Sequence, residues 1–365
     1  MDAISDNVFN DLDTVETVSD DPSLLTVILD ISPGSWFQLR DQISIVEVTK
    51  SLLVFLNAHL SLNNSNQVAF IVSSPVGSKF LYPSPVHGTE EQRNKPTLIT
   101  MNMYRQFRVV DEAVLQDLNT ELEQIRNNKK SYSAVSTLAG ALSMALTYTH
   151  RMLTLDQSIR TTTQSAINNT TNSQHHHNSG GTGNSNGSGH SSQLSSTNVK
   201  SRILVVSADD TDDLKYIPIM NSIFAAQKIK TSIDVAKLGA KNSSYLQQAS
   251  DATNGVYLKI EDPKGLIQVL SSAFFIEPSV RPLFILPTNS NVNYRASCFV
   301  TGKSVDLGYV CSICLCIMSL IPTDGKCPTC DSNFDARIIA QLKRAPAVVP
   351  KKRRKVVSTA PPITP

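Results

Sequence analysis

Five short runs of branched apolar residues recur along the first three quarters of this 365-residue chain. None alternates strictly between apolar and polar residues, which is typical of parallel strands that helices cover on both faces. Segments with apolar residues three or four positions apart, the spacing of a helix, lie between the runs. Strand and helix alternate from residue 24 to residue 275, and this predicts a doubly wound α/β sheet. The runs are LLTVILD (24–30), VAFIV (68–72), RILVVS (202–207), TSIDVA (231–236) and GVYLKI (255–260).

One segment interrupts this alternation. Residues 161–199 contain no charged residue and only four aliphatic ones, amid Ser, Thr, Asn, Gly and His. Such a composition cannot bury enough apolar surface to offset the entropy of ordering the chain, so we expect a disordered insertion between a helix and a central strand. Three consecutive histidines at 175–177 are a possible metal trap, but we interpret them as part of the low-complexity tract.

The composition also argues against a membrane or secreted protein. No run approaches the roughly 18 apolar residues that a membrane-spanning helix needs. Residues 1–21 are acidic, whereas a signal peptide is basic and then apolar, and we expect this segment to be disordered. We therefore expect a reducing compartment and no membrane partner. In such a compartment, closely spaced cysteines are more often metal ligands than disulfides.

Four of the six cysteines form two C-x2-C pairs separated by twelve residues, namely Cys311, Cys314, Cys327 and Cys330. Each pair can form a tight turn that presents two thiolates, and two such turns complete a tetrahedron around zinc. A closed shell of four cysteines leaves no open position, so we predict one structural Zn²⁺ ion. A redox dithiol pair or an iron centre is the alternative.

The other two cysteines do not extend this site. Cys316 lies between apolar residues and is expected to be a small core residue, and Cys298 alone does not make a second site. A RING-type ubiquitin ligase binds two interleaved zinc ions with four ligands each, and the chain has only these six cysteines and no nearby histidine. We expect a protein partner to bind the apolar residues beside the cysteines, which are Ile317, Met318, Leu320 and Ile321.

The basic residues are concentrated in one run near the C-terminus, PKKRRKV at 350–356. Without its five lysines and arginines, 28 basic residues face 31 acidic ones, so the folded part gives no argument for sequence-specific nucleic-acid binding. The run lies in a tail of Pro, Ala, Val and Thr that cannot pack. It is typical of a nuclear import signal, which predicts a nuclear protein that meets an import receptor; non-specific polyanion binding is the alternative.

Polar residues follow the first predicted strand in VILDISPGS, open a helix in STLAGAL, and follow a later strand in VVSADD. In a doubly wound sheet such residues lie beyond the carboxyl ends of the central strands, where ligands bind. Here the chain resembles the von Willebrand factor A domain, in which an Asp-x-Ser-x-Ser turn, a threonine and a second aspartate hold one divalent cation. The residues that match are Asp30, Ser32, Thr137 and Asp209.

The match to this cation site is degenerate. The third position of the turn is Gly34, which has no side-chain oxygen, and Pro33 stiffens the turn so that we do not expect Ser35 to take its place. We favour helix capping and loop hydrogen bonding for the four matching residues, with a magnesium site as the alternative. No glycine-rich phosphate loop and no Gly-x-Ser-x-Gly elbow is present, so we expect no enzymatic activity.

An A-type domain followed by YRASCF, GYVCSICL and CPTCDSNF resembles one family closely. The chain is similar to the smaller von Willebrand A-type, C4 zinc-binding subunits of the core of the general transcription and DNA repair factor TFIIH. The resemblance implies a nuclear, non-enzymatic scaffold that pairs with the larger A-type subunit and other core subunits. Two alternatives remain: a metal-dependent A-type domain that binds an acidic ligand, and a nucleic-acid-binding zinc protein.

These observations predict the following organisation. A disordered acidic segment is followed by an A-type domain with an insertion, a linker, a C4 zinc module and a disordered tail that contains the basic run. The ranges are 1–21, 22–276 with the insertion 161–199, 277–293, 294–335 and 336–365 with the basic run 350–356.

Overall fold

The computed structural model describes residues 21–83, 104–127, 136–173, 199–210, 215–278, 280–285 and 292–342. The chain divides into two compact units, Met1–Arg295 and Ala296–Pro365, which we call the α/β unit and the cysteine module. The division lies beside the predicted start of the module at residue 294. The acidic segment 1–20, the histidines 175–177 and the basic run 350–356 lie outside the described residues.

A six-stranded sheet forms the centre of the α/β unit, in the order β3-β2-β1-β4-β5-β6. The five strands from β2 to β6 pair in parallel, and β3 pairs antiparallel to β2 at one edge. The predicted doubly wound, mostly parallel sheet is confirmed. The strands are β1 (Ser23–Asp30), β2 (Gln67–Ser74), β3 (Gly77–Tyr82), β4 (Lys200–Ser207), β5 (Ser232–Lys237) and β6 (Tyr257–Lys259).

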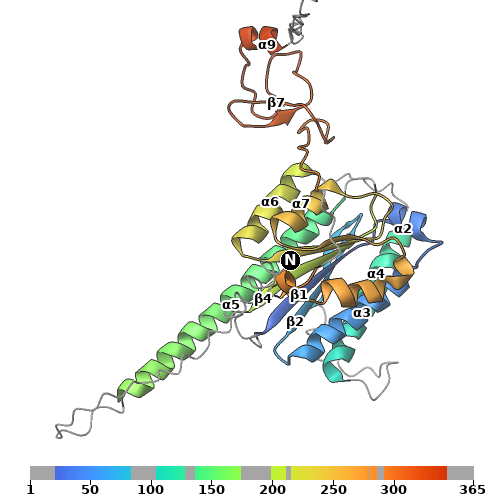
Figure 1. Cartoon of the computed structure of the whole chain (residues 1–365), viewed down its shortest axis with the longest axis vertical. Coiled ribbons are helices and arrows are strands. Elements are labelled where there is room, and N and C mark those ends of the chain that lie inside the picture. Colours follow the sequence, from blue (N-terminus) through green and yellow to red (C-terminus); the bar gives the residue numbers. More distant parts are fainter. Residues whose placement is uncertain are drawn as a thin grey trace, which may run out of the picture. The chain divides into compact units, whose positions relative to one another are not determined.

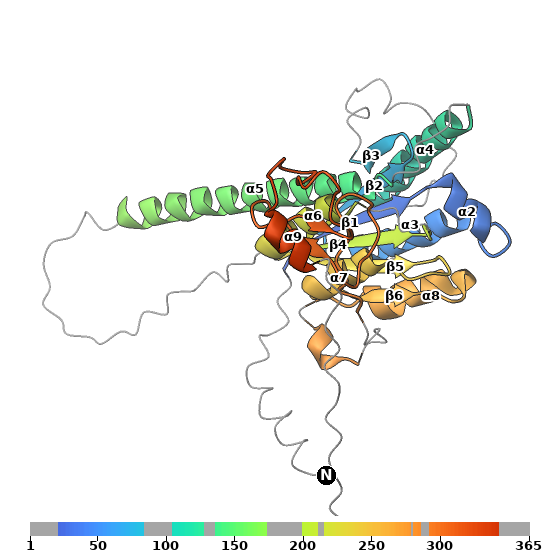
Figure 2. The same ribbon diagram turned by 90° about the horizontal axis from the view of Figure 1, so that it is seen from above.

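Helices cover both faces of this sheet (Figures 1 and 2). One core contains side chains of α2, α3, α4 and α8, and the other contains side chains of α5, α6 and α7. Strand β1 contributes to both cores, because Val27 and Leu29 lie in the first and Ile28 in the second. The helices are α2 (Pro33–Leu39), α3 (Ile45–Leu62), α4 (Arg105–Asn127), α5 (Leu138–Ser173), α6 (Tyr216–Lys228), α7 (Ser244–Ala252) and α8 (Leu266–Val269).

Helix α3 corrects one expectation drawn from composition. Its 18 residues are long and apolar enough to cross a membrane by those two criteria alone. Its buried side, which includes Val48, Leu52 and Leu56, lies in the core against the sheet. A capping box between Ser44 and Glu47 fixes its first turn. Packing against the sheet therefore accounts for the high hydropathy of this helix.

Helix α5 extends to Ser173, thirteen residues into the segment that composition predicts to be disordered. That prediction is wrong for residues 161–173, and residues 174–198 lie outside the described part of the chain. The composition excludes burial, but it does not exclude the continuation of a helix that has already been nucleated. Neither glycine nor proline occurs between Arg160 and Ser173, and the Thr162 hydroxyl donates to the Ser158 carbonyl one turn earlier.

A buried ion pair ties the segment after the last helices to the sheet. Arg281, in a 3₁₀ turn (Arg281–Leu283), donates to both carboxylate oxygens of Asp234 on β5, at 2.7 and 2.6 Å. Arg202 on β4 donates to the Phe274 carbonyl at 2.7 Å. Further along the segment, the Asn293 carbonyl accepts from Gln248 at 2.7 Å. The predicted linker 277–293 is thus bound to the α/β unit at both ends.

The described part of the cysteine module, residues 296–342, has little regular structure. It contains a two-stranded antiparallel pair, β7 (Tyr309–Val310) and β8 (Ile317–Met318), and the helix α9 (Ala336–Leu342). Helix α9 lies in the segment that we predicted to be a disordered tail, and it has no buried residue. Three cysteines and one methionine form the centre of the module. So small an apolar core needs a further source of stability.

Candidate metal centre

The structure brings together the four cysteines that the C-x2-C spacing singles out. The sulfur atoms of Cys311, Cys314, Cys327 and Cys330 all lie within 4.8 Å of one another. Cys311 Sγ is 3.9 Å from Cys330 Sγ, and Cys314 Sγ is 3.6 Å from Cys327 Sγ. A tetrahedron with metal–sulfur bonds of about 2.3 Å has edges of about 3.8 Å, so this donor set fits one tetrahedral metal ion.

Each pair sits on a tight turn that the backbone fixes. The Cys311 carbonyl accepts from the Leu315 N–H at 2.9 Å, and the Cys327 carbonyl accepts from the Asp331 N–H at 2.9 Å. Leu315 and Asp331 both have positive φ, 60° and 55°. The backbone N–H groups of Cys314 and Ile313 lower the pKa of the Cys311 thiol to about 6. At Cys311 the backbone therefore favours the thiolate, which is the form that binds metal, whereas the pKa of Cys314 in the same turn is raised.

Two neighbours of these sulfur atoms could not be found from spacing. Cys316 Sγ lies 3.3 Å from Cys327 Sγ, and burial raises the pKa of the Cys316 thiol. Ser332 Oγ lies 3.1 Å from Cys330 Sγ and 3.6 Å from Cys311 Sγ. Cys316 is a buried core residue as expected, but it also contacts a candidate ligand. The C-x2-C spacing carries no signal for Ser332.

The exposed apolar side chains of the module differ from those that we predicted. Met318 is buried in the core, Ile317 and Ile321 are half-buried, and only Leu320 is strongly exposed. The side-chain alternation of β8 explains the difference, because this short strand turns Met318 inward. The other exposed apolar residues around the cysteine turns are Leu307, Val310, Ile313 and Leu315.

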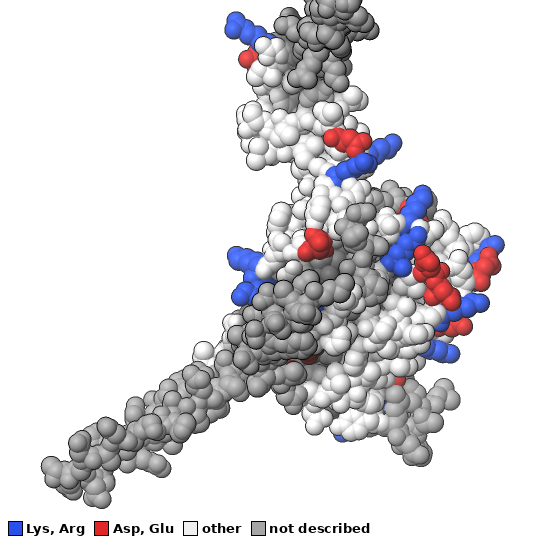
Figure 3. Space-filling model, viewed as in Figure 1, with Lys and Arg blue, Asp and Glu red and all other residues white. Residues whose placement is uncertain are grey.

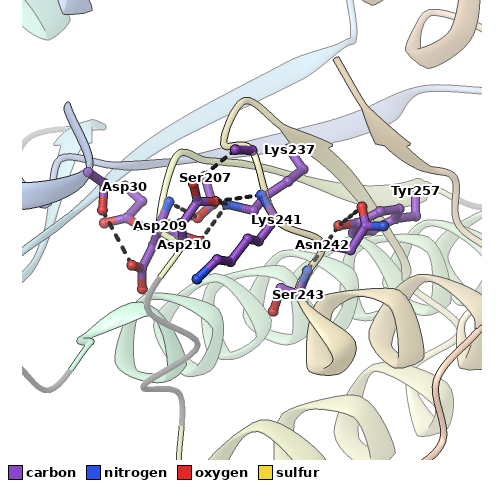
Figure 4. A network of polar contacts seen from close by, with 11 residues as sticks. Asp30, Ser207, Asp209, Asp210, Lys237, Lys241, Asn242, Ser243 and Tyr257 are labelled. Carbon is purple, nitrogen blue, oxygen red and sulfur yellow. Dashed lines mark hydrogen bonds and ion pairs between the residues drawn. The ribbon is translucent and has the colours of Figure 1, made fainter. Parts of the chain in front are cut away.

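At the carboxyl end of the sheet, Asp30 is buried, and each of its carboxylate oxygens accepts a hydrogen bond (Figure 4). Its Oδ1 accepts from the Ser32 N–H and its Oδ2 accepts from the Ser207 hydroxyl, both at 3.2 Å. Burial, together with the charge of Asp209, raises the pKa of Asp30 to about 7. The topology thus brings Asp30 and Asp209 together, as predicted.

The other predicted residues do not complete a cation site. The Thr137 hydroxyl donates to the Ser74 carbonyl at 2.7 Å and lies 2.8 Å from the Ser73 hydroxyl, so it ties α5 to the end of β2. Gly34 lies in the first turn of α2 and offers no side-chain oxygen. Ser35, which we did not expect at this position, donates to Asp209 Oδ1 at 3.3 Å. The helical turn that begins at Pro33 turns Ser35 inward.

Lys237 supplies a positive charge at this end of the sheet. Its side chain is fully buried, and its ammonium group donates to the Asp209 carbonyl and, at 2.9 Å, to Asp210 Oδ1. Asp210 also accepts from the backbone N–H groups of Ala240 and Lys241. A Cβ atom at Gly239 would lie 2.1 Å from Asp210 Oδ1, so only glycine fits here. An internal ammonium group holds the loop that carries Asp209, and the residues present do not fit an A-type cation site.

Comparisons with known proteins agree over most of the chain. The family model described as transcription factor Tfb4 matches residues 22–331. The chain belongs to the Tfb4 family. The subunit TFB4 of general transcription and DNA repair factor IIH from Debaryomyces hansenii is 62% identical over 98% of this chain and 97% of its own length. The corresponding protein from Saccharomyces cerevisiae is 40% identical over 99% of this chain and its whole length.

A solved structure is also similar to this member of the family. The crystal structure of the TFIIH p34 N-terminal domain is 25% identical, with a TM-score of 0.49, and it covers 70% of this chain and 99% of the solved chain.

The first prediction concerns the four cysteines. Cys327→Ser should release the bound metal and disorder the module, because metal ligation contributes on the order of 10 kcal/mol to such small folds. Metal content per chain measures the first effect. Fluorescence of Trp36, the one tryptophan, should show a folded α/β unit. Cys316→Ser is the matched control and should keep the metal; equal loss from both variants would contradict the assignment.

The second prediction concerns Asp30. Between about pH 4 and pH 7 the folded chain holds a proton on Asp30 that the unfolded chain has released, so the contribution of Asp30 to the free energy of unfolding falls as pH rises. Asp30→Asn lacks this dependence. The free energy of unfolding of the variant minus that of the wild type should grow by up to about 1.4 kcal/mol for each unit by which the pH rises. Urea unfolding followed by the fluorescence of Trp36 measures both free energies.

Comparing the two proteins removes the effect of His59. Burial lowers the pKa of His59 to about 4, which makes stability rise with pH over part of the same range in both proteins. Added magnesium should leave both unfolding curves unchanged. A magnesium-dependent gain in stability that Asp30→Asn abolishes would instead establish a cation site.

Proposed function

We propose that this chain is a non-catalytic structural subunit of the general transcription and DNA repair factor IIH. In this role it acts in initiation by RNA polymerase II and in nucleotide excision repair, in the nucleus. The observation that carries the proposal is the family match over residues 22–331, together with relatives of that name that align along nearly the whole chain.

The chemistry of the described residues supports a role without catalysis. Both oxygens of Asp30 accept hydrogen bonds, and the Lys237 ammonium group is held by Asp209 and Asp210. In the module, four cysteine sulfur atoms lie within 4.8 Å of one another, and a metal ion bound by all four would have no open position for a substrate. We infer that the metal is one structural Zn²⁺ ion, since four thiolates in a tetrahedron suit zinc and a reducing compartment disfavours disulfides.

The alternative, a metal-dependent A-type domain that binds an acidic ligand, is not favoured. It needs a cation with an open position for the acid of the partner. Gly34 removes one ligand, and the Thr137 hydroxyl is engaged with the end of β2. Nucleic-acid binding also lacks support: on the face drawn in Figure 3, lysine and arginine side chains lie among aspartate and glutamate.

We infer that the module binds the larger A-type subunit of the complex through its exposed apolar residues. Ile313 is 70% exposed at the tip of the first cysteine pair, and Val310 is 60% exposed beside it. Exposed apolar side chains on a rigid, metal-fixed turn are typical of a protein interface.

The third prediction tests assembly. The tagged chain, purified from its host, should bring TFIIH subunits with it, and the double variant Val310→Glu, Ile313→Glu should recover at least about tenfold less of the larger A-type subunit, since two buried charges cost more than 1.4 kcal/mol. Ile338→Glu, on exposed α9, is the control. Wild type without TFIIH subunits would refute the subunit role, whereas undiminished recovery by the double variant would refute only the interface.

We further infer that the basic run 350–356 is bound by a nuclear import receptor. The fourth prediction is that alanine at residues 351–355 lowers nuclear import of the free chain several-fold and leaves its metal content unchanged, since no cysteine is altered. The nuclear import of a fluorescently tagged chain is measured in cells that lack the larger A-type subunit. In such cells the chain cannot enter the nucleus together with that subunit. Unchanged import of this variant would remove the signal.

A further inference from the structure

The cysteine module contains three turns of the same backbone geometry, although only two of them carry the candidate metal ligands. They are turn 1 (298–303), turn 2 (311–316) and turn 3 (327–332). In each, the first N–H donates to the carbonyl five residues later, at 2.9, 3.0 and 2.9 Å. In each, the N–H of the fifth residue donates to the first carbonyl, at 2.8, 2.9 and 2.9 Å. The fifth residue has positive φ in all three, 70°, 60° and 55°.

The turns differ at their fourth residue. Turns 2 and 3 have cysteine there, Cys314 and Cys330, and turn 1 has Thr301. All three begin with a buried cysteine. Turn 1 thus has the backbone of a metal-binding turn and the first ligand, but lacks the second thiolate.

A residue from another part of the module faces the sulfur of turn 1. Ser319, which follows β8, directs both its N–H and its hydroxyl at Cys298 Sγ, at 3.3 and 3.4 Å. The second of these distances is close to the 3.6 and 3.9 Å between sulfur atoms of the four-cysteine cluster. The Ser319 hydroxyl therefore lies where a ligand from another part of the module would lie if Cys298 bound a metal ion.

The order of these groups along the chain is also informative. Along the chain the order is turn 1, turn 2, Ser319 and turn 3. Turn 1 contacts Ser319 and turn 2 contacts turn 3, so the first group pairs with the third and the second with the fourth. Alternating pairs are the connectivity of a module with two interleaved metal sites. Strands β7 and β8 lie between turn 1 and turn 3, and the Phe299 N–H donates to the Ile317 carbonyl at 2.8 Å, which holds turn 1 against β8.

We propose that the cysteine module has the architecture of an interleaved two-site metal module, in which the hydrogen bonds from Ser319 to Cys298 replace the metal of the first site. The native chain holds one metal ion, at the four-cysteine cluster. Thr301 and Ser319 occupy two of the ligand positions of the first site, and thiols at these two positions, with Cys298 and a water molecule as the fourth ligand, create a second zinc site.

The test is zinc content per full chain after purification in the presence of zinc. Wild type should hold one zinc ion, and Thr301→Cys combined with Ser319→Cys should hold two. The matched control is Ser304→Cys combined with Thr323→Cys, which adds the same number of thiols at exposed positions and should stay at one. Adding Cys298→Ser to the first double variant should return it to one, and Cys298→Ser alone should also hold one.

Each outcome decides the proposal. A Thr301→Cys, Ser319→Cys variant that holds one zinc ion or none overturns it, as does wild type that holds two. Equal zinc in the control double variant would show non-specific binding by added thiols and would likewise overturn it. Loss of zinc from Cys298→Ser alone would place Cys298 in the occupied site and contradict the assignment. The expected results do not depend on whether the chain assembles with TFIIH.

Discussion

The pairing of β1 with β2 and β4 is the interaction on which the α/β unit depends. All eight residues of β1 are buried, and its side chains alternate between the two cores, so neither helical layer can form without it. Parallel pairing in register also brings the ends of β1 and β4 together. Asp30 and Ser207 meet for this reason, and the hydrogen bond between them joins the two loops that leave the sheet at this end.

The central strands could be predicted because each is buried on both faces and therefore has a continuous apolar sequence. Strand β3 was missed because it is a half-buried edge strand with lysine and glycine in its short sequence. Helix α7 was missed because much of its buried side is polar, including Gln247 and Gln248. Helix α5 was predicted too short because composition measures the capacity for burial, which a helix that projects beyond the core does not need.

In the candidate sites, too, some residues could be predicted from sequence spacing and others only from the packing of the folded chain. The four cysteines were found because C-x2-C turns are local, and Asp30 and Asp209 because parallel strands end together. Lys237 could not be found, since a lysine in a sequence is expected to be exposed and its burial depends on Asp210 and on the space left by Gly239. Met318 was wrongly predicted to be exposed, because which side chains of the two-residue strand β8 point inward depends on its pairing with β7.

Buried polar groups are stabilised differently in the two units. In the α/β unit the Lys237 ammonium group and backbone N–H groups hold Asp209 and Asp210 by hydrogen bonds. In the module a four-cysteine cluster lies at the centre of a core too small to order itself, and a further turn of the same geometry, turn 1, is held by hydrogen bonds. In the α/β unit the charges of the loop that carries Asp209 are compensated within the chain, and in the module we infer that a metal ion supplies the compensation, so in both the surrounding surface can stay fixed while it contacts other proteins.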